Sequence, residues 1–391
     1  MPRVSAPIDR ILARIKVQAG IGGTWINKEP LESPSVSMTY GSCGIALGLL
    51  CIAQRENDPV ALATADVWAC SALRGSDRDG AFYNADFEIT PKIVGHGSPY
   101  HTASGTHATC ALIARAAGNL PEQVEATSEF IKAAARPVTG LDLTFGKSGI
   151  VMGSAILLDA AFGLPGDWTA LREFGDASVS DLWNVLDSKP GVEDADIDHL
   201  GIAHGWAGFL YATLQWHRIS NSDIPGGVFQ RLDELSALAM PAGRGVEWPW
   251  VIHAAGDPAT MAGWCNGSCG QVFLWSLAHD LFGDSRWLAM AEKAAWNSWE
   301  SNDASASLCC GLVGRAYALL NFFRHSGDPL WLDRARTLAH RAATNGRMPS
   351  EHQHSLYKGE FGLAVLAADL EAPDEAVMPF FEPFGYSSSA K

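Results

Sequence analysis

The pattern Gly-x-x-Gly recurs along this 391-residue chain and restricts the folds open to it. Six complete copies begin at Gly41, Gly146, Gly205, Gly267, Gly311 and Gly359, and a degenerate seventh is Thr102-Ala-Ser-Gly105. The second glycines of successive copies are 44 to 62 residues apart. Self-similarity at such a spacing is typical of a fold built from stacked supersecondary units. Seven copies therefore predict one repeated architecture, in place of the two or three domains that the length alone suggests.

Each repeat contains two kinds of segment. Residues 45–53 and 271–278 follow copies of the pattern and are apolar nearly all round, which is typical of a helix buried on most sides. Between the copies lie amphipathic segments such as 284–299 and 328–343. Asp284 and Asp328 are suited to cap these segments, and Pro329 suits a first helical position. The repeat unit is therefore predicted to be a hairpin of one amphipathic outer helix and one buried inner helix.

Seven hairpins can stack as an open superhelix or close into a ring. An inner helix that is apolar all round is easier to bury in a closed ring, so we expect an all-α, double-layered α/α toroid of seven helical hairpins. The glycines would mark the N-termini of inner helices, where two backbone segments pass closely. We expect residues 1–384 to form this single domain and residues 385–391 to form a flexible C-terminal tail.

Composition and charge exclude several classes of function. The chain is 47% hydrophobic and 18% charged, which is too apolar for a disordered protein. Its 28 basic and 43 acidic residues give a net charge of −15, which argues against nucleic acid or an anionic membrane as partner. The longest apolar runs are about half as long as a membrane span. Charges near the N-terminus argue against a signal peptide, and without one the eight cysteines do not indicate a disulfide framework. We therefore expect a soluble, cytoplasmic enzyme.

Equivalent positions of the seven repeats should meet at one end of the ring, and reactive side chains collect there. The residues directly before each pattern are Tyr40, His101, Phe145, His204, Asn266, Cys310 and Lys358. The residues one position earlier are Thr39, Tyr100, Thr144, Ala203, Cys265, Cys309 and Tyr357. This end of the toroid is therefore the predicted functional site.

Three cysteines of this set are candidate metal ligands. Cys265 and Cys309 occupy matching positions of neighbouring repeats, and Cys310 is adjacent to Cys309. Helix N-termini favour the thiolate form, so we expect lowered pKa values for these thiols and a site for a soft metal, with Zn²⁺ the preferred ion. Three ligands leave a fourth position open, as catalytic zinc requires. The alternative is three buried structural thiols. Cys269 could close the site as a fourth ligand, but Cys43 occupies the same place in another repeat, which favours packing.

His204 is the candidate acid or base, because imidazole gives or takes a proton near neutral pH. The alternative for a histidine near a helix start is a structural residue whose hydrogen bonds are satisfied. Asp142 lies four residues before Gly146 and could orient a histidine, or could instead cap a helix. His101, Asn266 and Lys358 are further pocket candidates, although each could simply be a rim residue.

Together these residues resemble the lanthionine synthetase C-like (LanC) family over nearly the whole chain. The resemblance lies in His204-Gly205-x-x-Gly208, Trp264-Cys265-Asn266-Gly267, Cys309-Cys310-Gly311 and Asp142-x-x-x-Gly146. It implies a double α/α toroid with zinc at the central mouth. By this resemblance Cys265, Cys309 and Cys310 are the zinc ligands, His204 is the acid/base and Asp142 is its partner.

The resemblance also implies the chemistry of a lanthipeptide cyclase. A Cys thiol of a dehydrated precursor peptide adds to a dehydroalanine or dehydrobutyrine of the same peptide, and a thioether ring of lanthionine or methyllanthionine results. The chain has no evident kinase or dehydratase segment, so a separate dehydratase is expected as partner. Three positions depart from the common pattern: Cys310 stands where many members have His, Met261 where an Arg is frequent, and Asn266 where a Tyr occurs.

Three other functions remain open from the sequence. The same zinc and histidine could add glutathione to dehydroamino acids in proteins, as eukaryotic relatives do. A similar toroid could prenylate thiols, but the Asp/Cys/His zinc set expected for that reaction is not evident. The chain could also be a non-catalytic scaffold on a cyclase fold; the intact ligands argue against this, whereas Met261 leaves it open.

Overall fold

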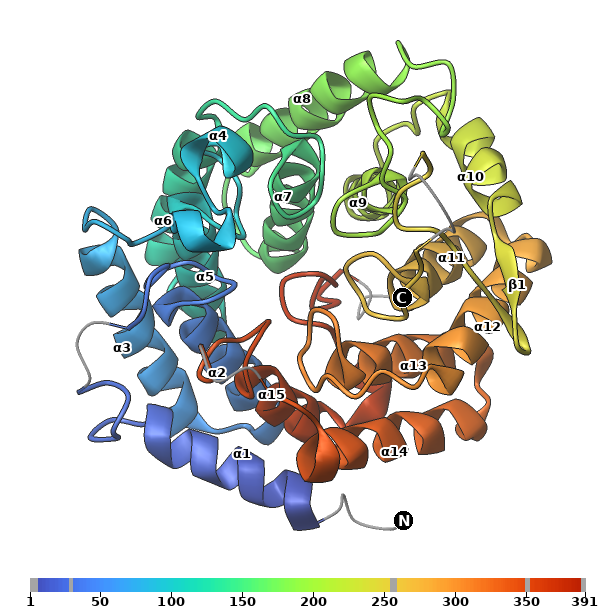
Figure 1. Cartoon of the computed structure of the whole chain (residues 1–391). Coiled ribbons are helices and arrows are strands. Elements are labelled where there is room, and N and C mark those ends of the chain that lie inside the picture. Colours follow the sequence, from blue (N-terminus) through green and yellow to red (C-terminus); the bar gives the residue numbers. More distant parts are fainter. Residues whose placement is uncertain (1–5, 28–30, 254–258, 349–351, 388–391) are drawn as a thin grey trace.

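Two concentric rings of helices make up the fold (Figure 1). The computed structural model describes residues 6–27, 31–253, 259–348 and 352–387. The inner ring consists of α2 (Ser42–Glu56), α5 (Ala103–Ala116), α7 (Lys147–Ala161), α9 (Trp206–Ser220), α11 (Ser268–Phe282), α13 (Leu312–Ser326) and α15 (Phe361–Asp369). The outer ring consists of α1 (Ala6–Ala19), α3 (Pro59–Gly75), α6 (Leu120–Ala134), α8 (Thr169–Leu186), α10 (Val228–Ala237), α12 (Ser285–Glu300) and α14 (Pro329–Asn345). The predicted double-layered α/α toroid is confirmed.

Short elements decorate the connections between hairpins. They are the 3₁₀ turns η1 (Ala85–Phe87) and η2 (Pro373–Glu375), the single-turn helix α4 (Pro91–Val94) and the strands β1 (Met240–Ala242) and β2 (Gly245–Glu247). The two strands pair antiparallel, with Met240 opposite Glu247. No described helix has both the length and the apolar character needed to cross a lipid bilayer.

The seventh hairpin is assembled from the two ends of the chain. Six inner helices pack against the outer helix that follows them, whereas α15 packs against α1 and α2 (Figure 1). The Arg14 guanidinium of α1 donates two hydrogen bonds of 2.7 Å to the Glu360 carboxylate directly before α15. Lys16 pairs with Asp58 at 2.7 Å beyond the end of α2. These contacts close the ring.

The glycine pattern arises from a close approach of two backbone segments. At every pattern glycine, a Cβ atom would lie 1.8–2.6 Å from the carbonyl oxygen six residues earlier. The same loop also accepts hydrogen bonds from backbone amides at the helix start, which lack partners within the helix. Ser42 N–H donates to Ser35 C=O at 2.9 Å, and Leu312 N–H donates to Ser305 C=O at 2.7 Å. None of the seven described inner helices has a side-chain cap. Each loop is therefore fixed to the helix start by its backbone, and only glycine leaves room for it.

The outer helices begin in a different way. Asp284 and Asp328 accept hydrogen bonds of 2.9 Å from Arg286 N–H and Leu330 N–H, so both predicted caps are confirmed. The interface between the rings is rich in tryptophan, and Trp275 of α11 stacks on Trp287 of α12 with ring centroids 5.1 Å apart. Such pairs bury large apolar areas and join the two layers.

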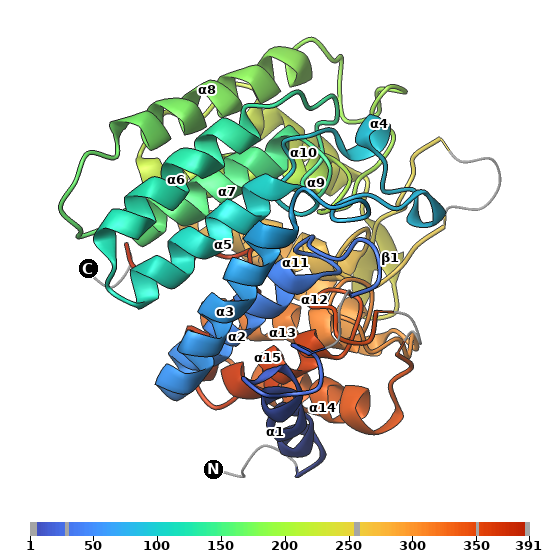
Figure 2. The same ribbon diagram turned by 90° about the vertical axis from the view of Figure 1, so that its left-hand side faces the viewer.

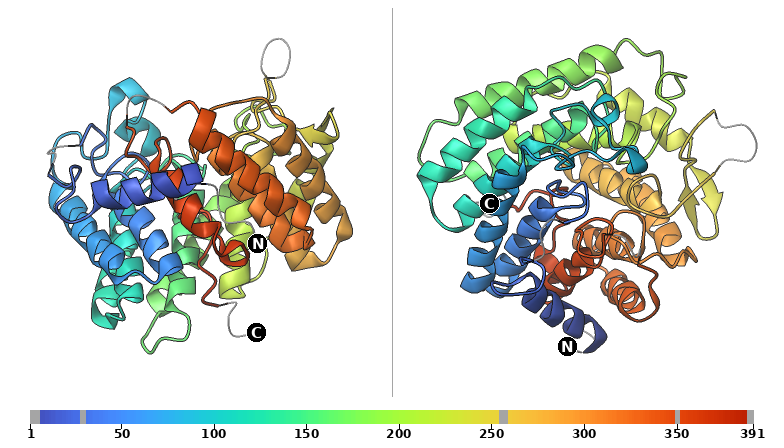
Figure 3. Two further views of the ribbon diagram at one scale, coloured as in Figure 1. Left: turned by 90° about the horizontal axis from the view of Figure 1, so that it is seen from below. Right: turned by 60° about the vertical axis from the view of Figure 1, so that its left-hand side comes forward.

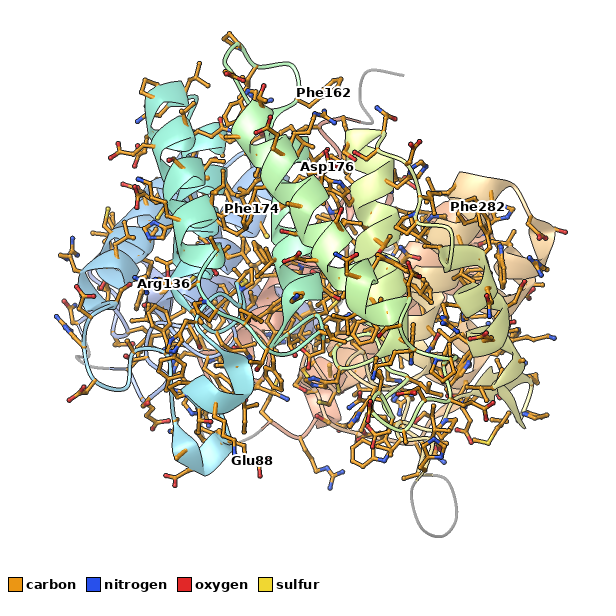
Figure 4. All side chains as sticks on the ribbon, turned by 90° about the horizontal axis from the view of Figure 1, so that it is seen from above. Glu88, Arg136, Phe162, Phe174, Asp176 and Phe282 are labelled. Carbon is orange, nitrogen blue, oxygen red and sulfur yellow. The ribbon has the colours of Figure 1, made fainter. Side chains whose placement is uncertain are left out.

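All inner helices start at the same end of the molecule. In Figure 2 the segments around α4 and β1 lie at the right-hand end, and the C-terminus lies at the other. The two views of Figure 3 show the same arrangement from other sides. Figure 4 places Glu88 at the end where the inner helices begin and Phe162, directly after α7, at the opposite end. We call the first of these ends the mouth.

The C-terminal segment 376–387 closes the ring axis beneath the mouth. Phe381 stacks on Tyr211 at a centroid distance of 4.4 Å and meets Trp264 edge-on at 5.2 Å. The Tyr357 hydroxyl donates to Pro379 C=O at 2.6 Å. The buried Asp159 carboxylate of α7 accepts hydrogen bonds from the backbone amides of residues 385–387. These three residues are thus attached to α7, contrary to the expected loose tail, whose residues 388–391 lie outside the described residues.

Candidate functional site

A circle of backbone hydrogen bonds fixes the rim of the mouth. The N–H of the residue two before each pattern donates to the equivalent C=O of the next repeat, as from Cys265 to Cys309 at 3.2 Å and from Cys309 to Tyr357 at 2.9 Å. Six of the seven links are made this way, over 2.8–3.4 Å. The link after the degenerate repeat is made instead by the Ser98 hydroxyl, which donates to Thr144 C=O at 2.5 Å. Residues that match in the repeats therefore meet in space.

This circle brings the three candidate cysteines together. Cys265 and Cys310 have their sulfurs 3.5 Å apart, those of Cys309 and Cys310 are 3.2 Å apart, and all three lie within 4.8 Å of one another. A tetrahedral ion with metal–sulfur bonds of about 2.3 Å needs sulfurs about 3.8 Å apart. Cys265 and Cys309 are buried and Cys310 is half-buried. The group therefore has the donor atoms and spacing of a site that could bind a metal.

Lys358 is the cation of this cluster. Its ammonium donates to Cys309 Sγ at 3.2 Å and to Cys310 Sγ at 3.6 Å. The sequence position next to the seventh pattern thus places it in contact with the thiols, and not at a solvent-exposed rim. The negative charge at Cys309 raises the pKa of Lys358 well above its ordinary value, so the ammonium stays charged.

The three thiols do not share one acidity. Hydrogen bonds from Cys265 and Cys310, with the charge of Lys358, hold the pKa of Cys309 well below its ordinary value. Hydrogen bonding to Cys309 raises the pKa of Cys265. The bond with Cys265 lowers the pKa of Cys310, but the bond to Cys309 and burial outweigh it and raise the pKa to about 12. The expected lowering is therefore correct for Cys309 and wrong for the other two, because one buried thiolate disfavours a second.

Cys269 lies outside the cluster, as its place in the repeat predicted. Its fully buried thiol donates to Gly314 C=O at 3.0 Å, and burial raises its pKa well above the ordinary value. The group of potential metal ligands found among the described residues comprises Cys265, Cys309 and Cys310 without it.

His204 is held from one side by two partners. Its Nδ1 lies 3.2 Å from Asp142 Oδ2 and 3.2 Å from Thr144 Oγ1. Asp142 in turn accepts a hydrogen bond of 2.5 Å from Phe145 N–H, which fixes the carboxylate at the start of the loop. Because Nδ1 is engaged, Nε2 is the nitrogen that can exchange a proton with a substrate. The predicted pairing of His204 with Asp142 is present in the structure.

His101 has the equivalent position in another repeat but a different environment. Its Nδ1 lies 3.2 Å from Thr39 Oγ1, as His204 lies from Thr144. Ser37 occupies the position that matches Asp142. Burial, together with the charges of His204 and Lys358, lowers the pKa of His101 to about 3. His101 therefore stays neutral, whereas His204 has a carboxylate partner and a side chain that is 25% exposed.

Aromatic and amide side chains complete the mouth. The Phe145 ring lies between the two histidines, with centroids 5.2 Å from His101 and 4.9 Å from His204. Asn266 is buried at 8% exposure, and its Oδ1 lacks a hydrogen-bond partner among the described residues. Met261 Sδ lies 3.9 Å from Cys265 Sγ. Of the three departures from the common pattern, Cys310 belongs to the thiol cluster, Asn266 directly follows Cys265 in the sequence, and Met261 contacts Cys265.

Sequence reasoning missed two parts of the site. Thr144 and Thr39 were visible in the repeat alignment, but nothing in their type marked them as histidine partners. The floor formed by Phe380 and Phe381 follows the last repeat, so no repeat position indicated where it packs. Trp264 and Tyr357 link this floor to the residues next to the cysteines.

Comparison with known proteins agrees with this geometry. A family model described as "Lanthionine synthetase C-like protein" matches residues 30–382. The chain is 27% identical over 192 residues to "Glutathione S-transferase LANCL1" of Danio rerio, covering 47% of this chain and 46% of that protein. It is also 27% identical over 192 residues to "LanC-like protein GCL1" of Arabidopsis thaliana, covering 46% and 43%. The alignments thus span less than half of these curated relatives. Nisin cyclase shares the fold, with a TM-score of 0.66 over 93% of both chains at 14% identity.

Proposed function

The chain belongs to the lanthionine synthetase C-like family, and we propose that it is a zinc-dependent lanthipeptide cyclase. In this proposal a Cys thiol of a dehydrated precursor peptide adds to a dehydroalanine or dehydrobutyrine and forms a (methyl)lanthionine thioether. The observation that supports it most strongly is the buried group of three thiols within 4.8 Å of one another, on the same circle of loops as the His204–Asp142 pair.

The three cysteines fit zinc by type and number. Cys265, Cys309 and Cys310 would hold the ion, and their three sulfurs leave one tetrahedral position for a substrate. Zinc bound there supplies a Lewis acid that keeps a substrate thiol deprotonated at neutral pH. Binding must displace the protons that Cys265 and Cys310 retain, so metal affinity should rise with pH.

His204 is assigned the proton transfer. The thiol releases its proton to solvent, the C–S bond forms at the β-carbon, and the electron pair of the C=C bond moves to the α-carbon and its carbonyl. The α-carbon then takes a proton, which His204 Nε2 delivers. Asp142 holds Nδ1 and so orients Nε2 for this transfer, after which His204 regains a proton from solvent. His101 is unsuited to this step because its lowered pKa keeps it neutral.

The substrate must come from a reaction that removes water from Ser or Thr side chains. We assign that step to a separate dehydratase and place both reactions in the cytoplasm. The precursor peptide would then reach the mouth with its dehydro residues already formed.

The metal content of the purified protein tests the proposal without a guessed substrate. We expect about one zinc per chain in the parent and a large loss in Cys265→Ala, because a three-ligand site cannot tolerate the removal of one ligand. Cys269→Ala is the matched control: it removes a buried thiol outside the cluster and should retain the zinc. A parent that stays free of zinc after reduction and metal resupply would rule out the cyclase mechanism and leave the scaffold alternative.

Glutathione addition is the second candidate, favoured by the name of the Danio rerio relative, glutathione S-transferase. A dehydrated, Cys-containing peptide incubated with and without glutathione separates the two. Ring closure leaves the peptide mass unchanged and removes a free thiol, whereas the second reaction adds the mass of glutathione. The cyclase proposal is contradicted if only the adduct forms.

A further inference from the structure

A third thiolate changes the charge of the proposed metal centre. Zn²⁺ with two thiolates and a neutral imidazole carries no net charge, whereas Zn²⁺ with three thiolates carries −1. Cys310 supplies this third thiolate. A buried net charge is unfavourable unless an opposite charge lies close to it. The cluster therefore requires a cation that a centre with only two thiolates does not need.

Lys358 meets that requirement by position. Its ammonium contacts Cys309 Sγ at 3.2 Å and Cys310 Sγ at 3.6 Å, so it reaches both adjacent thiols at once. No ion pair between described residues joins Lys358 to a carboxylate. Its charge is thus directed at sulfur.

The backbone holds Lys358 in this place. Cys309 N–H donates to Tyr357 C=O at 2.9 Å, and Lys358 N–H donates to the Ser355 hydroxyl oxygen at 3.2 Å. The loop that carries the lysine is therefore hydrogen-bonded to the loop that carries the two cysteines. The backbone from which the lysine side chain extends is therefore ordered before the side chain contacts the thiols, so only side-chain freedom is lost in that contact.

We propose that Lys358 is the counter-charge of the three-thiolate centre. It donates hydrogen bonds to Cys309 and Cys310, offsets the charge that the third thiolate adds, and strengthens metal binding. It is a positioning residue and takes no part in bond formation. This inference rests on the metal function proposed above.

Zinc affinity, measured by competition with a chromophoric chelator, tests the inference in the full-length protein. Lys358→Met removes the charge at similar size, and we expect it to weaken zinc binding at least tenfold. Lys358→Arg keeps the charge and should restore affinity to within about threefold of the parent. Lys147→Met is the matched control, since Lys147 also lies beside an inner-helix N-terminus but pairs with Asp181 at 3.9 Å. Equal affinity of Lys358→Met and the parent would overturn the inference.

A double-mutant cycle separates charge compensation from a general structural effect. Cys310→His replaces the third thiolate by a neutral ligand. In that background Lys358→Met should cost less than threefold in zinc affinity, against tenfold or more with Cys310 present. An equal cost in both backgrounds, or a loss that follows a lowered unfolding temperature, would refute the counter-charge.

Cobalt substitution adds a spectroscopic readout that does not depend on activity. Loss of the Lys358 hydrogen bonds makes the sulfurs more electron-rich, so the sulfur-to-Co²⁺ charge-transfer band should move to lower energy in Lys358→Met and not in Lys147→Met. An unshifted band contradicts the inference. If Lys358 instead anchored a peptide carboxylate, Lys358→Met would raise KM and leave zinc affinity unchanged, which would also overturn it.

The outcomes distinguish this inference from the proposed function. If the parent binds no zinc, both fail. If the parent binds zinc and forms rings while Lys358→Met keeps parental affinity and spectrum, only the inference about Lys358 fails.

Discussion

The two equivalent histidines of the mouth show how a single residue gives one repeat a different environment from that of its neighbour. Each has its Nδ1 3.2 Å from a threonine hydroxyl, but among the described residues only His204 also contacts a carboxylate. Burial keeps His101 neutral with a pKa of about 3. A carboxylate partner is what stabilises an imidazolium long enough to deliver a proton. The difference between Asp142 and Ser37 therefore supports our proposal that His204 is the acid.

Replacement of each histidine by Asn tests this assignment. We expect His204→Asn to lower kcat for ring formation by about 10²- to 10⁴-fold, the usual contribution of a general acid, with unchanged zinc content. His101→Asn is the control and should retain activity within about tenfold. The assignment is wrong if His101→Asn is the more damaging of the two, as measured by mass spectrometry of free thiols over time.

The grouping of the cysteines could be predicted from the sequence because the glycines align the repeats with one another. Residues at matching positions of this alignment are then expected to lie close together. Lys358 also occupies a matching repeat position, but its contact partner could not be predicted. A lysine side chain is long enough to reach either the solvent or the cysteine sulfurs. Only the distances to Cys309 and Cys310 decide this. The acidities of the thiols depend on mutual hydrogen bonds and were likewise beyond a reading of the sequence.

At the level of helices, the Gly-x-x-Gly pattern predicted where the inner ring begins. Six inner helices start directly after the first position of the pattern, and α15 starts two residues after Gly359. The reason is steric, because each of the two glycines lies against the carbonyl group six residues before it, where a side chain would not fit. The β1–β2 hairpin and α4 were not predicted, because they lie in connections that do not repeat and their residues carry no shared pattern.

A glycine substitution measures this constraint. Gly149→Ala should destabilise the protein by about 1 to 3 kcal/mol, because the new Cβ would lie 2.2 Å from the Leu143 carbonyl oxygen and the loop would have to move. Gly226→Ala is the control, since a Cβ there meets no atom within 4 Å. Urea unfolding of the two variants decides the matter. Equal stability of Gly149→Ala and the parent would show that the loop yields easily.

For the molecule as a whole, the closed ring followed from the apolar inner helices, but its floor did not. Phe381 contacts Tyr211 of α9, Phe273 of α11 and Trp264 in the loop that leads into α11. This segment follows the last repeat and has no counterpart in the other repeats. Its packing position could therefore not be predicted by aligning the repeats. Its serines favour a flexible tail from residue 385, whereas residues 385–387 are hydrogen-bonded to the buried Asp159.

Truncation of the floor should weaken the entire ring. We expect Phe381→Ala to lower the free energy of unfolding by about 3 to 5 kcal/mol, the usual cost of an aromatic cavity in a core. Phe229→Ala is the control, because that ring is 46% exposed, and its cost should stay below about 1 kcal/mol. Denaturant unfolding supplies both values. A small cost for Phe381→Ala would mean that the inner helices hold the ring without the floor.

The pairing of α1 with α15 also determines when the molecule can be finished during synthesis. Residues 6–19 leave the ribosome well before their partner, residues 361–369, which follows more than 300 residues later. Until then α2 lacks the neighbour that covers one flank of it, and apolar surface stays exposed to other chains. The nascent chain therefore depends on protection from aggregation until α15 has been made, and the mouth can acquire its complete circle of loops only after that point.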